Sequence, residues 1–102
     1  MTEYRVVWSP KAIEKVKAIE EYIKVGLAAP QTALQIKRRL HKAAGSLSKM
    51  PERYPVDQEV KEYHYLVEHN YFIYYRIKKS PNIVEIATVR HHLQARLSSI
   101  EE

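Results

Sequence analysis

The sequence predicts an α+β protein with an N-terminal strand, an antiparallel helical hairpin and a three-stranded antiparallel block that completes one mainly antiparallel sheet. Residues 10–47 place apolar side chains at helical spacing. Residues 60–92 instead contain β-branched and aromatic runs separated by short turn sequences. Because the helices precede most of the strands, we expect the hairpin to pack on one face of the sheet. A length of 102 residues fits a single domain spanning 1–102.

The first strand is expected in Glu3–Trp8, where EYRVVW is rich in β-branched and aromatic residues. Ser9 can then cap a helix whose first position is taken by Pro10. A buried stripe at helical spacing predicts that this helix runs from Pro10 to about Val25 and ends near Gly26, a common helix stop. The stripe consists of Ile13, Val16, Ile19 and Ile23.

The second helix is expected to begin at Pro30, after the short connection LAAP. Its predicted buried stripe consists of Ala33, Ile36, Leu40, Ala43 and Leu47. Two amphipathic helices joined by so short a loop predict an antiparallel hairpin. The basic cluster from Lys37 to Lys42 is either a solvated helix face or a binding surface.

A loop with two prolines is expected over Ser48–Asp57. Three strands follow it, joined by the turns HN and KSPN. They are predicted in Val60–His69, Tyr71–Lys78 and Ile83–His92.

The chain is basic, with 17 Lys and Arg against 12 Asp and Glu and a formal net charge of +5. Such a balance suits an acidic partner such as nucleic acid, the ribosome or an acidic protein, although it also serves solubility. The chain has no cysteine, which excludes disulfides and thiolate chemistry. It has no apolar run of ~18 residues and no secretory signal, so we expect a cytoplasmic protein that does not enter a membrane.

Known cofactor and metal motifs are missing from the sequence. It has two glycines and no GxGxxG or Walker phosphate loop, so no nucleotide cofactor is expected. It has no HExxH. His91 and His92 are adjacent in a predicted strand, which would point their side chains to opposite faces, so no metal site is expected either.

The candidate site lies at the end of the last predicted strand. There Arg90, His91 and His92 could act in RNA cleavage, a histidine moving protons while cations stabilise the phosphate. Further cations and a tyrosine could bind phosphate: Arg76, Arg53, Lys61, Tyr54 and Arg96. Strand alternation places His92, and not His91, on the face of Arg90, so Arg90 with His92 is the expected catalytic pair. The alternative is that both histidines only make structural hydrogen bonds.

Three stretches together resemble toxins of the RelE/ParE superfamily from bacterial type II toxin–antitoxin systems. They are YRVVWSPKAIEKVKAIEEYI, LSKMPERYP and YHYLVEHNYFIYYRIKKSPNIVEIATVRHHLQ. The resemblance runs from about Tyr4 to Gln94. It implies a compact sheet with a helical hairpin, growth inhibition by the free toxin, and a cognate antitoxin that forms a hetero-oligomer with it. We expect that antitoxin to be acidic and partly disordered, and to add a strand or lay a helix across a groove near the hairpin.

The resemblance leaves two targets open. The RelE-like branch cleaves mRNA in the ribosomal A site with side chains on the sheet, whereas the ParE-like branch poisons DNA gyrase. His92 and Arg90 match nuclease positions, but Leu93 stands where that branch has Tyr, and Tyr71 stands where it has Arg. The helix opened by WSP and the NYFIYYRI strand resemble the ParE side, so a gyrase-binding toxin is favoured. The alternatives are a ribosome-dependent mRNA endonuclease using Arg90 and His92, and a non-toxic module that only binds its antitoxin.

Overall fold

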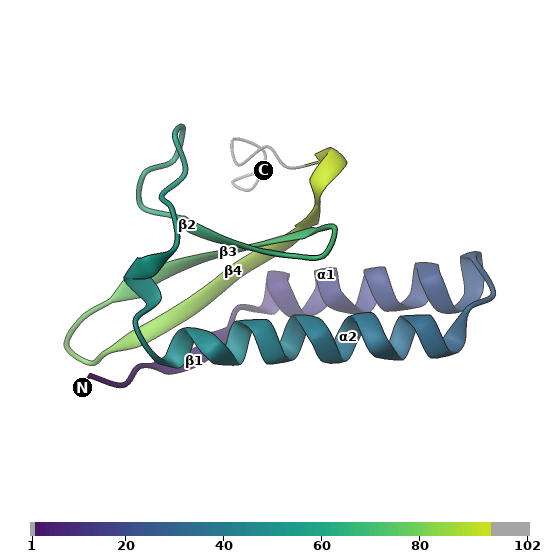
Figure 1. The fold of residues 1–102 in the computed structure, drawn as a ribbon, viewed down its shortest axis with the longest axis horizontal. Helices are drawn as coiled ribbons and strands as arrows, with labels where there is room; N and C mark the ends of the chain where they lie inside the picture. The colour runs from purple at the N-terminus through teal and green to yellow at the C-terminus, as the bar shows by residue number, and fades with distance from the viewer. Residues whose placement is uncertain (1, 95–102) are drawn as a thin grey trace.

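The computed structural model describes residues 2–94 and shows two helices packed on one face of a four-stranded sheet (Figure 1). A π-helical turn over Tyr22–Gly26 follows the first helix, and 3-10 turns occupy Ser46–Ser48, Pro51–Arg53 and His92–Gln94. The helices and strands are β1 Arg5–Trp8, α1 Pro10–Glu21, α2 Pro30–Gly45, β2 His64–Glu68, β3 Tyr71–Lys78 and β4 Ile83–His91. The predicted α+β class and element order are confirmed. No helix within residues 2–94 is long and apolar enough to cross a membrane.

The strand order in the sheet is β1-β4-β3-β2. β2, β3 and β4 form an antiparallel meander, whereas β1 runs parallel to β4. The first strand of the chain therefore lies beside the last one, because the meander begins with β2 at the far edge of the sheet and ends with β4 next to β1. β2 is shorter than predicted and begins at His64. The Asp57 side chain accepts hydrogen bonds from the N–H groups of Glu59 (2.9 Å) and Val60 (2.8 Å), which bends the preceding residues into a turn.

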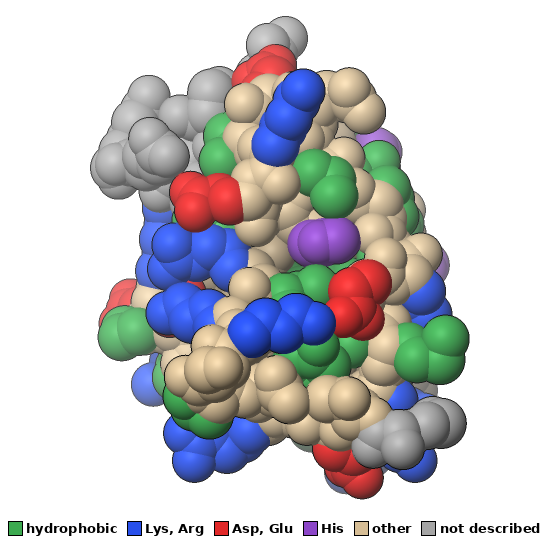
Figure 2. Space-filling model, turned by 90° about the vertical axis from the view of Figure 1, so that its left-hand side faces the viewer, with side chains coloured by type: hydrophobic (Ala, Val, Ile, Leu, Met, Phe, Trp, Pro, Cys, Tyr) green, Lys and Arg blue, Asp and Glu red, His purple; other side chains and the backbone are tan. Residues whose placement is uncertain are grey.

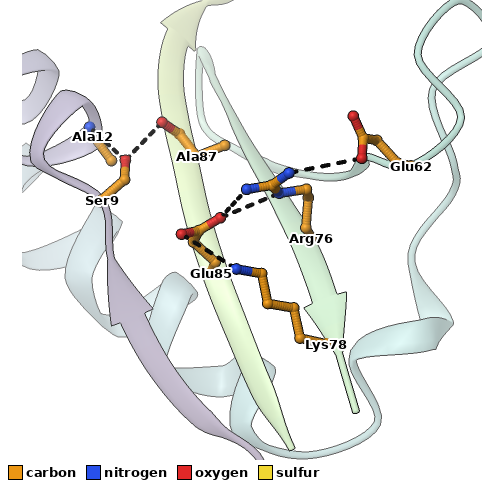
Figure 3. Close-up of polar contacts among 7 residues, drawn as sticks. All are labelled: Ser9, Ala12, Glu62, Arg76, Lys78, Glu85 and Ala87. Carbon is orange, nitrogen blue, oxygen red and sulfur yellow. Dashed lines mark hydrogen bonds and ion pairs between the residues drawn. The ribbon is translucent and has the colours of Figure 1, made fainter.

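Ser9 fixes the start of α1 and joins it to the sheet. Its hydroxyl oxygen accepts a hydrogen bond from the N–H of Ala12 at 3.0 Å, which is the predicted helix cap. The same hydroxyl donates to the carbonyl of Ala87 in β4 at 2.9 Å (Figure 3). One side chain therefore sets the helix boundary and ties the helix to β4.

The end of the first helix differs from the prediction. The α-helix stops at Glu21, and the chain continues as the π-helical turn, in which Leu27 N–H donates to the carbonyl of Tyr22 at 3.0 Å. Ala28, with φ of 50°, takes the left-handed conformation that often follows a helix end. A Cβ at position 26 would lie 3.1 Å from the ring of Tyr22, which is a tight contact.

The main core lies between the helices and the sheet, and a smaller cluster covers the other face of the sheet. The main core holds Val16 and Leu40 from the helices and Ile73, Tyr75, Val84, Ile86 and Val89 from the strands. The smaller cluster holds Tyr63, Tyr74 and Ala87. Ile13 was wrongly predicted to be in the core, since 43% of it is exposed and Ala12 is buried in its place.

An extra residue in β4 changes which side chains face the helices. Tyr74 pairs with Thr88 and Tyr75 with Ile86, so Ala87 has no partner in β3 and forms a bulge. Ile86 and Val89 therefore both face the main core, although they are three positions apart. The residues after the bulge point to the face opposite the one that simple alternation predicts.

Candidate functional site

Arg90 lies on the sheet face opposite the helices. It pairs with Phe72 of β3, whereas the neighbouring pair, Ile73 and Val89, faces the main core. Without the bulge at Ala87, Arg90 would share the helix-facing side with Ile86. The bulge thus places the Arg90 side chain on the open face of the sheet.

The two histidines are not separated as predicted. β4 ends at His91, and His92 begins a 3-10 turn in which its N–H donates to the carbonyl of Asn70 at 2.8 Å. Strand alternation therefore stops before His92, and the two imidazole rings lie with centroids 4.5 Å apart. The prediction that they point to opposite faces is wrong, because it extended the strand by one residue.

His91 faces the helical side of the sheet. Its ring meets the edge of the Tyr71 ring at 5.5 Å and 89°, and Tyr71 belongs to the main core. Its Nδ1 accepts a hydrogen bond from the N–H of Leu93 at 3.2 Å. His92 is exposed on the turn. Between Thr2 and Gln94 no group of three His, Cys, Asp or Glu side chains could hold a metal ion.

Arg76 lies on the open face and is held by carboxylates (Figure 3). Its Nη2 and Nε bond to one oxygen of Glu85 at 2.5 and 3.2 Å, and its Nη1 lies 3.7 Å from Glu62. The hydrogen bond from Arg76 lowers the pKa of Glu85 and raises that of Arg76 itself. Lys78 lies 3.8 Å from the other oxygen of Glu85. These two cations and two carboxylates neutralise one another.

Arg76 and Arg90 do not converge on one point. They pair with Glu85 and Phe72, so four residues of β3 separate their positions along the sheet. At the usual rise of a strand this is about 13 Å. The Arg76 guanidinium is held by Glu85 and Glu62, so it is not extended along the sheet toward Arg90.

Arg53 and Tyr54 stabilise the loop after α2. The Arg53 guanidinium donates to the carbonyls of Lys49 and Met50, stacks on the Tyr54 ring at 4.7 Å, and lies 3.3 Å from its hydroxyl. Tyr54 is half-buried against the main core. Figure 2 views the end of the molecule that carries this loop and shows Lys and Arg side chains spread over it with Asp and Glu among them. Lys61 is exposed near the start of β2, and Arg96 lies outside the described residues.

A second polar cluster, which the sequence did not reveal, links three distant segments. The Tyr4 hydroxyl donates to Glu52 at 3.1 Å and accepts from the Lys79 ammonium at 2.7 Å. Lys79 also lies 3.1 Å from the same oxygen of Glu52. The pKa of Lys79 is raised by these contacts with Tyr4 and Glu52. The cluster joins the residue that precedes β1, the loop after α2 and the β3–β4 turn.

A groove of about 670 Å³ opens between the helical hairpin and the end of the sheet. Apolar side chains of α1, the π-helical turn and α2 line it together with Tyr71 and Val89, while Lys15, Arg90 and His91 border it. Tyr22, Leu27 and Leu93 line the groove and are 64%, 56% and 80% exposed, respectively. The far end of the hairpin projects beyond the sheet (Figure 1), which leaves these residues without a covering layer. The signal in the sequence was the apolar stretch YIKVGL at the helix end.

A comparison with models of protein families identifies one family. The family described as ParE toxins of the type II toxin–antitoxin system parDE matches residues 6–96. A comparison with curated protein sequences finds no significant match.

Solved structures show a similar fold at low sequence identity. The chromosomal ParDE toxin–antitoxin system from P. aeruginosa superposes with a TM-score of 0.77 at 19% identity, covering 89% of this chain and 98% of that one. The toxin–antitoxin complex RelBE2 from Mycobacterium tuberculosis gives 0.63 at 22% identity, covering 89% and 93%. A mutant of the E. coli toxin RelE in the free state gives 0.66 at 11% identity, covering 97% and 90%. At these identities the likeness concerns the fold.

Proposed function

The chain belongs to the ParE toxin family of type II toxin–antitoxin systems, and from this we propose that it inhibits growth by binding DNA gyrase when its antitoxin is absent. The observation that carries the choice of target is the state of Arg76, which two carboxylates hold in place. RNA cleavage needs cations that are free to meet the phosphate and a proton-transfer group beside them.

The positions of the other candidate residues support the same choice. Arg90 lies about 13 Å from Arg76 along the sheet, and His91 faces the helices. His92 is exposed on a turn beyond the strand. Because residues 2–94 contain no cluster that joins a histidine to two unpaired candidate cations, binding of a protein target accounts for the arrangement better than catalysis does.

Two assays on the purified chain test the target. We expect inhibition of gyrase supercoiling, and we expect no cleavage of translated mRNA by primer extension. Unaffected gyrase would refute the proposed target. Cleavage that is lost in the His91→Ala/His92→Ala double variant would replace it with the mRNA endonuclease. Overexpression without growth arrest would indicate the non-toxic antitoxin-binding module.

We further propose that the groove at the hairpin holds a segment of the antitoxin. Its apolar lining suits the apolar side of an amphipathic helix, and Lys15 at its border suits an acidic residue on that helix. The similar structures are those of the ParDE toxin–antitoxin system and of the toxin–antitoxin complex RelBE2. The expected antitoxin is therefore an acidic segment that becomes ordered when it binds.

A matched pair of variants tests the groove. Leu27→Glu places a charge in the groove, whereas Val67→Glu places one at a similarly exposed position that does not line it, the two residues being 56% and 53% exposed. We expect Leu27→Glu to weaken binding of the antitoxin encoded by the neighbouring gene by at least tenfold, ~1.4 kcal/mol, and Val67→Glu to leave it unchanged. Equal affinities in titration calorimetry would rule out this groove, and failure of the neighbouring product to co-purify would refute the pairing.

A further inference from the structure

The positive charge of the chain is concentrated on α2. The chain has a formal net charge of +5, and the 16 residues of α2 contain four Lys or Arg and no Asp or Glu. In α1, by contrast, three lysines are balanced by three glutamates. Although the two helices form one layer, only α2 carries a net charge.

Within the described part of the chain, only one of the four charges on α2 is paired with a nearby carboxylate. Lys37 lies 3.7 Å from Glu20 of α1. Arg38, Arg39 and Lys42 are exposed, and no ion pair among residues 2–94 involves them. The sheet cations Arg76, Lys78 and Lys79 are all paired with glutamates. The structure thus pairs these three cations with carboxylates, whereas Arg38, Arg39 and Lys42 are exposed to solvent.

The three cations form one continuous surface. Arg38 and Lys42 are four residues apart and Arg39 and Lys42 three, spacings that bring their Cβ atoms to about 5–6 Å on a helix. The buried residues Leu40 and Ala44 point toward the core. α2 lies in the outer layer of the molecule, so this surface is open to a large partner (Figure 1).

The surroundings of these cations favour nucleic acid over an acidic protein. Protein interfaces are built around apolar and aromatic side chains, and Leu34 is the only large apolar residue of α2 that is exposed. The other exposed neighbours include Gln31, Thr32 and Gln35, which can donate hydrogen bonds to phosphate oxygens. Duplex DNA presents one negative charge per ~1.7 Å along its axis and so offers a phosphate to each cation.

We propose that the surface formed by Arg38, Arg39 and Lys42 binds the phosphate backbone of duplex DNA without reading its sequence. Each of the three side chains contributes one phosphate contact. The surface is separate from Arg76 and from the open face of the sheet, so this inference does not depend on the choice of target proposed above.

The test compares two triple variants that lose the same charge. Arg38→Gln/Arg39→Gln/Lys42→Gln removes the surface, and Arg5→Gln/Lys17→Gln/Lys24→Gln removes three exposed cations elsewhere. Binding to a labelled duplex of random sequence is followed by anisotropy between about 50 and about 200 mM salt. We expect the slope of log K against log salt to become less steep by roughly 2.7 in the α2 variant, about 0.9 per phosphate contact. The control variant should keep the slope of the wild type.

Three results would overturn the proposal. Absence of binding by the wild type at low salt would exclude a DNA surface, and equal loss in both variants would show that only net charge matters. If polyglutamate binds the wild type more tightly than DNA does, and the α2 variant loses that binding, the surface binds an acidic protein instead. Circular dichroism and urea unfolding of both variants establish that each is folded.

Discussion

Replacing Ser9 by alanine is expected to destabilise the protein at two places at once. The substitution removes the acceptor for Ala12 N–H at 3.0 Å and the donor to the Ala87 carbonyl at 2.9 Å. Loss of a helix cap costs about 1 kcal/mol, and loss of the second hydrogen bond costs about 1 kcal/mol more. The free energy of unfolding should therefore fall by about 2 kcal/mol, which corresponds to a fall in Tm of roughly 8–16 °C for a domain of this size.

Urea denaturation followed by circular dichroism measures this loss, and two further variants divide it. Ser9→Asp keeps an oxygen that can cap the helix but has no hydroxyl to donate to Ala87, so it should recover only the capping part, about 1 kcal/mol. Ser46→Ala is the control, because the Ser46 hydroxyl bonds only to the Ala43 carbonyl on the exposed end of α2; it should change the free energy of unfolding by less than about 0.5 kcal/mol. If Ser9→Ala were no less stable than Ser46→Ala, the dual role of Ser9 would be refuted.

Three further perturbations test other contacts. Tyr75→Phe removes a buried hydroxyl that donates to the Pro51 carbonyl at 2.6 Å and should cost about 1–3 kcal/mol, since the carbonyl loses its partner; an unchanged urea midpoint would contradict this. Tyr4→Phe removes the hydroxyl between Lys79 and Glu52 and should lower the free energy of unfolding by about 1 kcal/mol in urea denaturation. Wild-type stability would show that the ion pair between Lys79 and Glu52 is enough to hold these segments together. In the folded protein, the hydrogen bond with Arg76 holds the pKa of Glu85 below its ordinary value of 4.5. As the pH falls below 4.5, the unfolded chain therefore binds more protons at Glu85 than the folded protein does. The advantage of the wild type over Glu85→Gln in unfolding free energy should therefore be full above pH 4.5 and shrink below it; an advantage that stays constant into acid would contradict the link to Glu85 ionisation.

The elements that could be predicted from the sequence are those whose determinants are local. Ser9 and Pro10 mark the start of α1 through a contact three residues away, and β3 has the predicted bounds Tyr71–Lys78 because two turn sequences flank an unbroken apolar run. The bulge at Ala87 could not be predicted, because it depends on pairing with β3 and on a hydroxyl from a helix 78 residues earlier. The exposure of Ile13 likewise depends on how α1 is rotated against the sheet.

In the candidate site, too, local features could be predicted and features set by strand pairing could not. The sequence identified Arg76 as a cation on a strand beside the last one, which the structure bears out. Its pairing with Glu85 is set by the register of two strands, and a residue type alone does not reveal it. The exchange of faces by Arg90 and His91 follows from the one-residue bulge, which an alternating pattern does not predict.

The parallel pairing of β1 with β4 also affects how the protein emerges from the ribosome during synthesis. Val6, near the N-terminus, has its sheet partner at Val84, so β1 can be paired only after most of the chain has been synthesised. The helical hairpin can form early from local contacts, but its apolar face then waits for strands that arrive later. A chain interrupted before residue 83 lacks the strand that joins β1 to the meander. Products that end before β4 therefore cannot assemble this sheet, and the sheet can be completed only after β4 has been synthesised.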